Sequence, residues 1–195
     1  MRKTDVNLKT IDDKLLHKVL NYISTLRNHK EVRLMFELAL RSGMRRCNFI
    51  NLTIGDVLDD NNEVKDIIIL NPSKSKGDTY NKYYVSDVLK KEIKQFLDGW
   101  DVEDKTRYLF VSPKTNKPYN KCYISQLFTK IYATFGVHNS THATRRSFIT
   151  SMLDKNIPIT TIQHLVNHKS YASTSAYYNT DVNRLKNVVN LFDVK

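Results

Sequence analysis

Apolar residues recur at helical spacing through most of the chain, and this periodicity limits the possible folds more than any other feature. The first such run follows Thr10, which stands where a helix N-cap is expected, with an acidic residue at the third helical position. Its apolar positions are Ile11, Leu15, Leu16, Val19, Leu20 and Ile23. Glycine and proline, five and four among 195 residues, are too scarce for long flexible joints. The pattern predicts one compact, mainly helical unit.

Capping residues and helix breakers divide the rest of the chain into further predicted helices. Ser86, Asn120 and Thr141 each stand directly before a helical run and can act as N-caps. Gly43 should end one helix, and Pro158 suits the first turn of another. The predicted helices cover residues 31–41, 45–52, 87–97, 121–131, 142–153 and 158–167, with a final amphipathic segment at 182–192.

A small β-sheet is the expected exception to the helical pattern. Val64–Leu70 is rich in isoleucine and follows a turn cluster, which predicts a strand. Lys82–Val85 should form the return strand after a polar, basic tip, and Tyr108–Val111 a short extended piece. The expected fold class is therefore mainly α with a small antiparallel β-sheet, either a two-stranded hairpin or a three-stranded sheet.

The charge of the chain indicates a polyanionic partner. Lysine and arginine number 31 against 20 acidic residues, a formal net charge of +11. Such a surplus attracts nucleic acid and makes binding depend strongly on salt. A basic protein without a polyanion partner remains an alternative explanation of the charge alone.

Apolar runs and cysteines indicate the compartment. The longest apolar run, Ile67–Leu70, is far too short to cross a bilayer, and the polar segment Met1–Asp5 does not resemble a signal peptide. We therefore expect a cytoplasmic protein without a membrane partner. Cys47 and Cys122 lie in apolar-periodic segments without a nearby cysteine, which predicts buried thiols in a reducing compartment.

Four short patches carry residue types suited to phosphodiester chemistry. They are Ser42–Arg46, Lys74–Lys76, the pair His142 and Arg145, and His168 followed nine residues later by Tyr177. Arginine binds two phosphate oxygens with its planar fork, and residues at i and i+3 share a helix face. Each patch alone has an ordinary explanation: a solvated arginine, solubilising lysines on a strand edge, a chance pair, and a tyrosine at the edge of the core.

In order and spacing, the four patches resemble the catalytic signature of the tyrosine recombinase (phage integrase) family. The flanking residues share the resemblance from about Thr10 to Tyr178. The similar segments are Leu40–Arg45 ("L-x-T-G-hydrophobic-R"), Leu52–Val57 ("L-x-x-x-D-hydrophobic"), Tyr108–Ser112, Thr141–Phe148 ("H-x-L-R-R/H-T/S-F"), Leu165–Ser170 ("L-L-G-H-S-S") and Thr174–Tyr177 ("T-x-x-Y").

The resemblance implies the catalytic-domain fold of that family and a role for each candidate residue. Tyr177 would attack the scissile phosphate and form a 3′-phosphotyrosine. Arg45 and Arg145 would hold the non-bridging oxygens, and Lys74 would protonate the leaving 5′-oxygen. Of the two remaining catalytic candidates, His142 would assist proton transfer and His168 would position the phosphate. Arg46, Lys76 and Arg146 would bind DNA, and Lys76 is the alternative catalytic lysine. The resemblance implies no metal ion or other cofactor.

The resemblance also implies partners and domain organisation. The expected partner is double-stranded DNA carrying specific recombination sites. The protein would be a monomer in free solution and a homotetramer on paired sites, with accessory DNA-bending proteins as further partners. We expect one catalytic domain over residues 1–195 without an N-terminal DNA-binding domain, as in short members such as the fimbrial phase-variation recombinases.

The chain departs from the family pattern at three places. Asn48 stands three residues after Arg45, where the family usually has an acidic residue. Asn167 replaces the glycine before His168, and asparagine tolerates the left-handed backbone expected there. The hairpin is longer than the usual pattern, which leaves the choice between Lys74 and Lys76 open.

Three other functions stay open at this point. A type IB topoisomerase uses similar residues to relax DNA. A zinc protein could use His138 with His142 and His164 with His168, since each pair has i, i+4 spacing. A DNA-binding module without catalytic activity is the third alternative.

Overall fold

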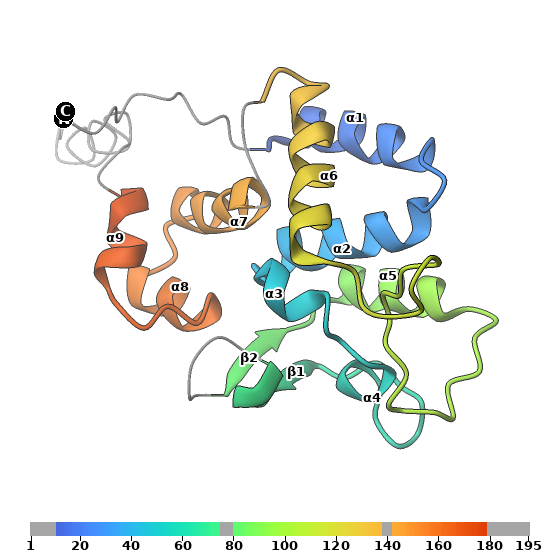
Figure 1. The fold of residues 1–195 in the computed structure, drawn as a ribbon. Coiled ribbons are helices and arrows are strands. Elements are labelled where there is room, and N and C mark those ends of the chain that lie inside the picture. Colours follow the sequence, from blue (N-terminus) through green and yellow to red (C-terminus); the bar gives the residue numbers. More distant parts are fainter. Residues whose placement is uncertain (1–10, 75–79, 138–141, 179–195) are drawn as a thin grey trace, which may run out of the picture.

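Helices dominate the computed structural model, which describes residues 11–74, 80–137 and 142–178 (Figure 1). The longer helices are α1 (Asp13–Ser24), α2 (His29–Arg41), α5 (Asp87–Leu97), α6 (Lys121–Ala133) and α7 (His142–Asp154). The shorter ones are α3 (Arg46–Phe49), α4 (Ile54–Val57), the 3-10 helix η1 (Pro72–Lys74), α8 (Ile159–Leu165) and α9 (Ala172–Tyr178). The predicted mainly helical fold is confirmed. No helix within the described ranges has the length and apolarity needed to span a membrane.

The described sheet contains two strands. Strand β1 (Ile67–Leu70) pairs antiparallel with β2 (Asn81–Tyr84), and Ile69 lies opposite Lys82. The three-stranded alternative is wrong for the described residues. Val64 lies outside β1 because it forms only an isolated bridge with Leu58. The extended piece predicted at Tyr108–Val111 likewise contributes only isolated bridges.

Side-chain caps set the starts of several helices. Ser86 accepts a hydrogen bond from the backbone N–H of Leu89, and Asn120 accepts one from Cys122, as predicted. Helix α1 begins later than expected because Asp12 is its N-cap, with its carboxylate 2.7 Å from the N–H of Leu15. Thr10 and the predicted cap Thr141 lie outside the described residues.

Three predicted boundaries near the site differ from the structure. The helix expected at 45–52 is only α3, because the chain turns at Ile50 and then starts the short helix α4, which was not predicted. Helix α8 ends at Leu165, and Pro158 is its N-cap rather than part of its first turn. Helix α9, which carries Tyr177, was not predicted either, and the predicted segment 182–192 lies outside the described residues.

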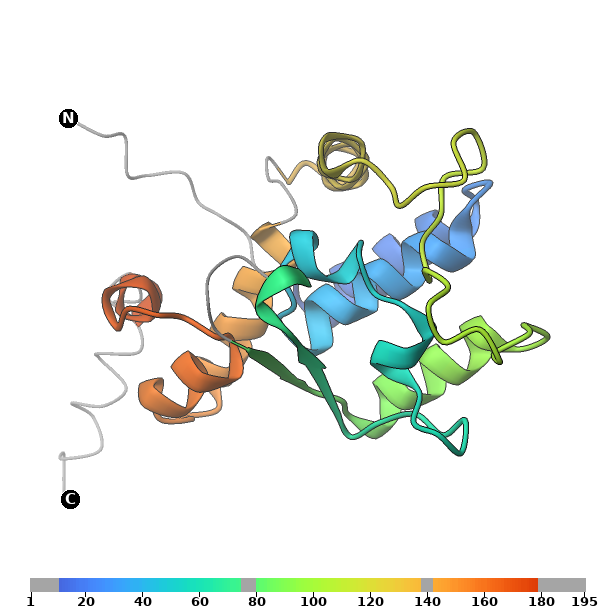
Figure 2. The ribbon, with the colours of Figure 1, turned by 60° about the horizontal axis from the view of Figure 1, so that its bottom comes forward.

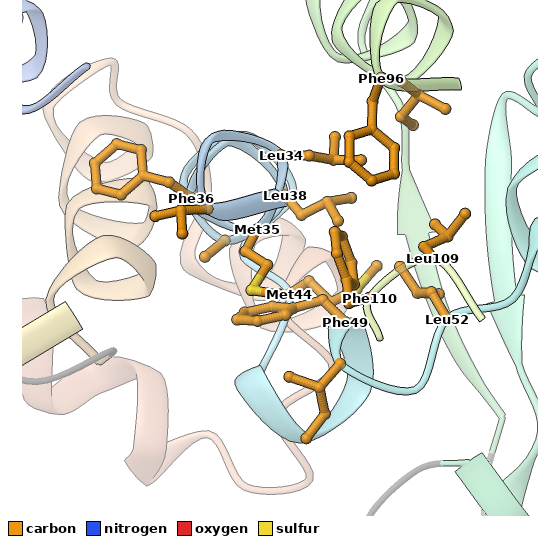
Figure 3. Packing of buried hydrophobic residues seen from close by; sticks show 14 of the residues in the cluster. Leu34, Met35, Phe36, Leu38, Met44, Phe49, Leu52, Phe96, Leu109 and Phe110 are labelled. Atoms are coloured by element: carbon orange, nitrogen blue, oxygen red, sulfur yellow. The ribbon is translucent and has the colours of Figure 1, made fainter. Parts of the chain in front are cut away.

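The main core joins helices α1 to α6 and the hairpin. In Figure 3 the rings of Phe49, Phe96 and Phe110 pack among the aliphatic side chains of α2 and of the segments around Leu52 and Leu109. The Phe128 ring packs against the rings of Phe36 and Phe49, with centroid distances of 6.1 and 6.3 Å. Aromatic pairs at such distances add stability beyond the area that they bury.

A second, smaller cluster joins the end of α7 to α8 and α9. Its buried members are Phe148, Ile149, Leu153, Ile162 and Val166, and Tyr177 packs against it. Figures 1 and 2 show α8 and α9 beside α7, away from α5 and α6. Helix α7 belongs to both regions because Ala143, in its first turn, packs in the main core.

The two cysteines differ in their surroundings. Cys47 is half-buried, and its thiol lies 3.1 Å from Oδ1 of Asn48. Cys122 is exposed. The predicted burial is wrong for Cys122 because it lies in the first turn of α6, on the face that does not pack against the core.

Candidate active site

Two arginines from distant parts of the chain bind backbone carbonyls at the end of α8. Arg145 donates through Nη1 to the carbonyl of Gly43 and through Nη2 to that of Val166. Arg45 donates through Nη2 to the carbonyl of Asn167, at 3.0 Å. The C-terminal end of a helix carries partial negative charge, which favours guanidinium groups there. The predicted phosphate-binding arginines therefore lie next to each other.

Gly43 makes this arrangement possible. Its φ of +63° lies in the left-handed region, which favours glycine. A Cβ atom at this position would lie 2.8 Å from Cδ1 of Phe148 and 3.2 Å from Cγ1 of Val166. The close approach places the Gly43 carbonyl against Arg145, so the glycine joins α2 to the second cluster.

The Arg145 guanidinium is buried, with 5% of the residue exposed. Burial, reinforced by the positive charge of Arg45, lowers the pKa of Arg145 to about 10, so it stays charged at neutral pH. Within the described residues no carboxylate forms an ion pair with Arg45 or Arg145. Buried charge without a counter-ion is unfavourable, so a bound anion would be strongly stabilised here.

The two candidate histidines both lie within reach of the charges of this pair. Burial and the charges of Arg145 and Arg45 lower the pKa of His168 to about 4, which keeps the ring neutral. Its Nδ1 lies 2.8 Å from the hydroxyl of the fully buried Thr174. His142 lies at the surface, where desolvation and then the nearby arginines, Arg46 first, lower its pKa. Both shifts favour the neutral form of the ring.

Tyr177 lies on α9, at the edge of the second cluster. The guanidinium of Arg146 stands over its ring, 5.6 Å from the centroid, a cation–π geometry. The phenol is also close enough to Arg145 to influence the pKa of that arginine. The structure thus brings together Arg45, Arg145, His142, His168 and Tyr177, with Arg46 and Arg146 beside them.

The candidate lysine Lys74 binds residues around α4 in this structure, not the arginine site. Its Nζ lies 2.6 Å from Oδ2 of Asp56 and 3.3 Å from the hydroxyl of Thr53. Asp56 also accepts the backbone N–H of Thr53, so one carboxylate caps α4 and binds the lysine. The ammonium of Lys74 thus contacts Asp56 and Thr53 rather than a residue of the arginine site, and the alternative Lys76 lies outside the described residues.

Comparison with known proteins shows which family the chain belongs to. A sequence model of the phage integrase family matches residues 9–184. The chain belongs to the phage integrase family. Tyrosine recombinase XerH of Campylobacter jejuni is 26% identical over 168 residues, which make up 84% of this chain and 44% of XerH. Tyrosine recombinase XerA of Pyrococcus horikoshii is 26% identical over 183 residues, 93% of this chain and 60% of XerA.

A solved structure of the Tn1549 transposon integrase, in complex with transposon right end DNA, has the same fold. The TM-score is 0.73 at 12% identity, and the match covers 100% of this chain and 69% of that one. The chain spans about half the length of the two curated relatives named above, 44% of XerH and 60% of XerA.

The phage integrase signature did not reveal Tyr83 as part of the site. Tyr83 is fully buried, and its hydroxyl accepts a hydrogen bond from Nδ2 of Asn48 at 2.7 Å. Burial raises the pKa of Tyr83, whereas the charges of Arg145 and Arg45 act in the opposite direction. Asn48, where the family usually has an acid, therefore binds a phenol near both arginines. The sequence predicted only that Tyr83 lies in the return strand Lys82–Val85.

Thr174 contacts a site residue in a way that the sequence did not predict, and the histidine pairs bear on the zinc alternative. Thr174 was noticed only as part of a flanking motif, although it holds the ring of His168. For the zinc alternative, His138 lies outside the described residues. Among the residues that the structure does describe, no group of three or more histidine, cysteine or acidic side chains is arranged to hold a metal ion.

Proposed function

We propose that this protein is a site-specific DNA recombinase that cuts and rejoins strands through a 3′-phosphotyrosine at Tyr177. One observation carries the proposal: the ring of Tyr177 lies against the guanidinium of Arg146, while the neighbouring Arg145 and Arg45 both bind carbonyls at the end of α8. Attack on phosphate requires a nucleophile next to groups that stabilise negative charge. Membership of the phage integrase family, and the DNA bound to the Tn1549 integrase, support the choice of DNA as substrate.

The cleavage step would use these residues as follows. The Oη of Tyr177 bonds to phosphorus while the bond from phosphorus to the 5′-oxygen breaks. The phenol proton passes to neutral His142, and Arg45 and Arg145 stabilise the charge on the non-bridging oxygens. His168, neutral and held by Thr174, donates a hydrogen bond to the phosphate through Nε2. The energy of the broken ester is kept in the phosphotyrosine, so a 5′-hydroxyl from a second duplex can reverse the step.

The leaving 5′-oxygen needs a proton, and a hairpin lysine would supply it. Lys74 is partly exposed in its ion pair with Asp56, at 29% and 14% side-chain exposure. Such pairs contribute about 1 kcal/mol or less, so a DNA phosphate can compete for the ammonium. We therefore propose Lys74 as the proton donor, with Lys76 as the alternative.

The test is a covalent-adduct assay on nicked duplexes. A nick beside the cleavage point lets the 5′-hydroxyl fragment diffuse away, which traps the phosphotyrosine. A pool of nicked duplexes with randomised sequence should yield protein-linked DNA, and sequencing the linked strands gives the cleavage site. Tyr177→Phe should bind the selected duplex without forming an adduct, whereas the control Tyr178→Phe should form it normally. Adduct formation in Tyr177→Phe but not in Tyr178→Phe would contradict the assignment.

A second assay separates recombination from relaxation. Two plasmid-borne copies of the selected site should exchange strands. Relaxation of a supercoiled plasmid without any site, and no exchange between sites, would identify a type IB topoisomerase instead.

We also propose a homotetramer on paired sites, formed from free monomers, in which the C-terminal segment docks on a neighbouring protomer. Val182, Leu185, Val188, Val189 and Phe192 fall at helical spacing after Tyr177, which makes an apolar stripe. Deleting residues 183–195 should leave DNA binding intact and prevent strand exchange on a two-site substrate. The mobility of the DNA products on a gel measures the exchange. Unchanged exchange by the truncated protein would contradict docking between protomers.

A further inference from the structure

Asn167 binds two parts of the site at once. Its backbone carbonyl accepts the hydrogen bond from Arg45 at 3.0 Å. Its side-chain amide binds the backbone of Lys82 on β2: Oδ1 accepts from the Lys82 N–H at 3.1 Å, and Nδ2 donates to the Lys82 carbonyl at 2.8 Å. Figures 1 and 2 both show β2 beside α8, in agreement with the contacts between these elements.

The amide of Asn167 pairs with the outer edge of β2 as a third strand would. In an antiparallel ladder, alternate residues turn both backbone groups away from their partner strand. Lys82, opposite Ile69, is such a residue, and its N–H and carbonyl both bind Asn167. The amide of Asn167 therefore links β2 to the carbonyl that Arg45 binds, in addition to the hydrogen bond of Tyr83 with Asn48.

Two requirements together select asparagine at this position. The φ of Asn167 is +50°, where glycine and asparagine are the residues that fit most readily. Glycine would keep the backbone and the bond to Arg45, but it has no amide with which to bind Lys82. Asn156 also has a positive φ, +58°, and is exposed, and its side chain makes no hydrogen bond within the described part of the chain. A left-handed backbone alone thus does not explain the contact with β2.

We propose that Asn167 is a positioning residue that holds the hairpin, and with it the proton-donating lysine, in place relative to the phosphate bound by Arg45. The inference rests on the proposed function. Loosening the hairpin should slow the cleavage step through poorer protonation of the leaving 5′-oxygen, without displacing Tyr177. A small displacement of a general acid lowers the rate substantially.

The test compares two leaving groups in single-turnover cleavage of the duplex selected in the adduct assay. Replacing the bridging 5′-oxygen by sulfur removes the need for a proton, because a thiolate is a good leaving group. Asn167→Gly should cleave the oxygen substrate between about 10-fold and 100-fold more slowly than the wild-type protein. It should cleave the sulfur substrate at the wild-type rate.

Matched variants make the outcome decisive. Asn156→Gly, which changes an exposed left-handed asparagine, should cleave both substrates normally. Lys74→Ala and Lys76→Ala provide the reference, since loss of the proton donor itself should be rescued by sulfur. Equal slowing of Asn167→Gly on both substrates, or wild-type rates on both, would overturn the proposal. Absence of any adduct from the wild-type protein would instead refute the proposed function.

Discussion

The main core and the second cluster differ in size and in what they contribute to the site. Among the described residues, the main core extends over α1 to α6, the hairpin and the first turn of α7, whereas the second cluster has five buried residues. Arg45 and the hairpin belong to the main core region. Tyr177 and His168 belong to the smaller region, which α7 and a few polar contacts connect to the rest. Regions that bury few apolar side chains open more easily.

Arg145 connects the two regions directly. Its guanidinium donates to Gly43, which follows α2, and to Val166, at the end of α8. The side chain that we assign to the phosphate therefore also holds the nucleophile-bearing cluster against the main core. A phosphate bound at Arg145 and Arg45 would therefore stabilise the junction between the two regions. It would also favour the position of Tyr177 near these two arginines.

The largest expected effects come from the arginines at this junction. Arg45→Ala and Arg145→Ala should each lower the cleavage rate by about 10²- to 10³-fold, since each removes a donor to the transition state. Only Arg145→Ala should also lower the free energy of unfolding strongly, by about 2 kcal/mol or more, because two carbonyls lose their donor and a cavity forms. Urea unfolding and adduct formation measure the two effects. Equal stability loss in both variants would contradict the special role of Arg145.

Matched truncations in the two regions should separate their stabilities. Ile93 in α5 and Ile162 in α8 are both fully buried. Ile93→Val and Ile162→Val should each cost about 1 kcal/mol. Ile162→Val should reduce hydrogen-exchange protection mainly in α8 and α9 and slow cleavage, whereas Ile93→Val should leave cleavage unchanged. Uniform loss of protection over the whole chain in both variants would mean that the regions unfold as one unit.

The smallest expected effect is a pH dependence from the second cluster. The pKa of His168 is lowered from 6.5 to about 4, so the folded state disfavours its protonation. The associated stability is fully present above pH 6.5 and is lost as the pH falls toward 4, because the unfolded chain binds the proton first. After allowance for solvent screening, the loss should be on the order of 1 kcal/mol. Urea unfolding of wild type and His168→Gln between pH 7 and 4 should show a steeper decline in the wild type, and parallel curves would contradict the shift.

Some of this architecture follows from local sequence alone. Helical periodicity, the caps Ser86 and Asn120 and the break at Gly43 depend on residues within a few positions of each other, so they could be predicted. The left-handed backbone at Asn167 is confirmed for the same reason. The order of the patches indicated the family, since signature residues keep their sequence even where they lie far apart in the chain.

Only the tertiary structure decided which groups meet at the site. Arg145 and Gly43 are separated by 102 positions, Lys82 and Asn167 by 85, and Asn48 and Tyr83 by 35. No local pattern encodes such pairs, because each depends on how helices and strand pack once their apolar faces are buried. The same reason explains why the ion pair of Lys74 with Asp56 and the exposure of Cys122 could not be predicted. Burial then set the charge states, making His168 neutral while leaving Arg145 charged.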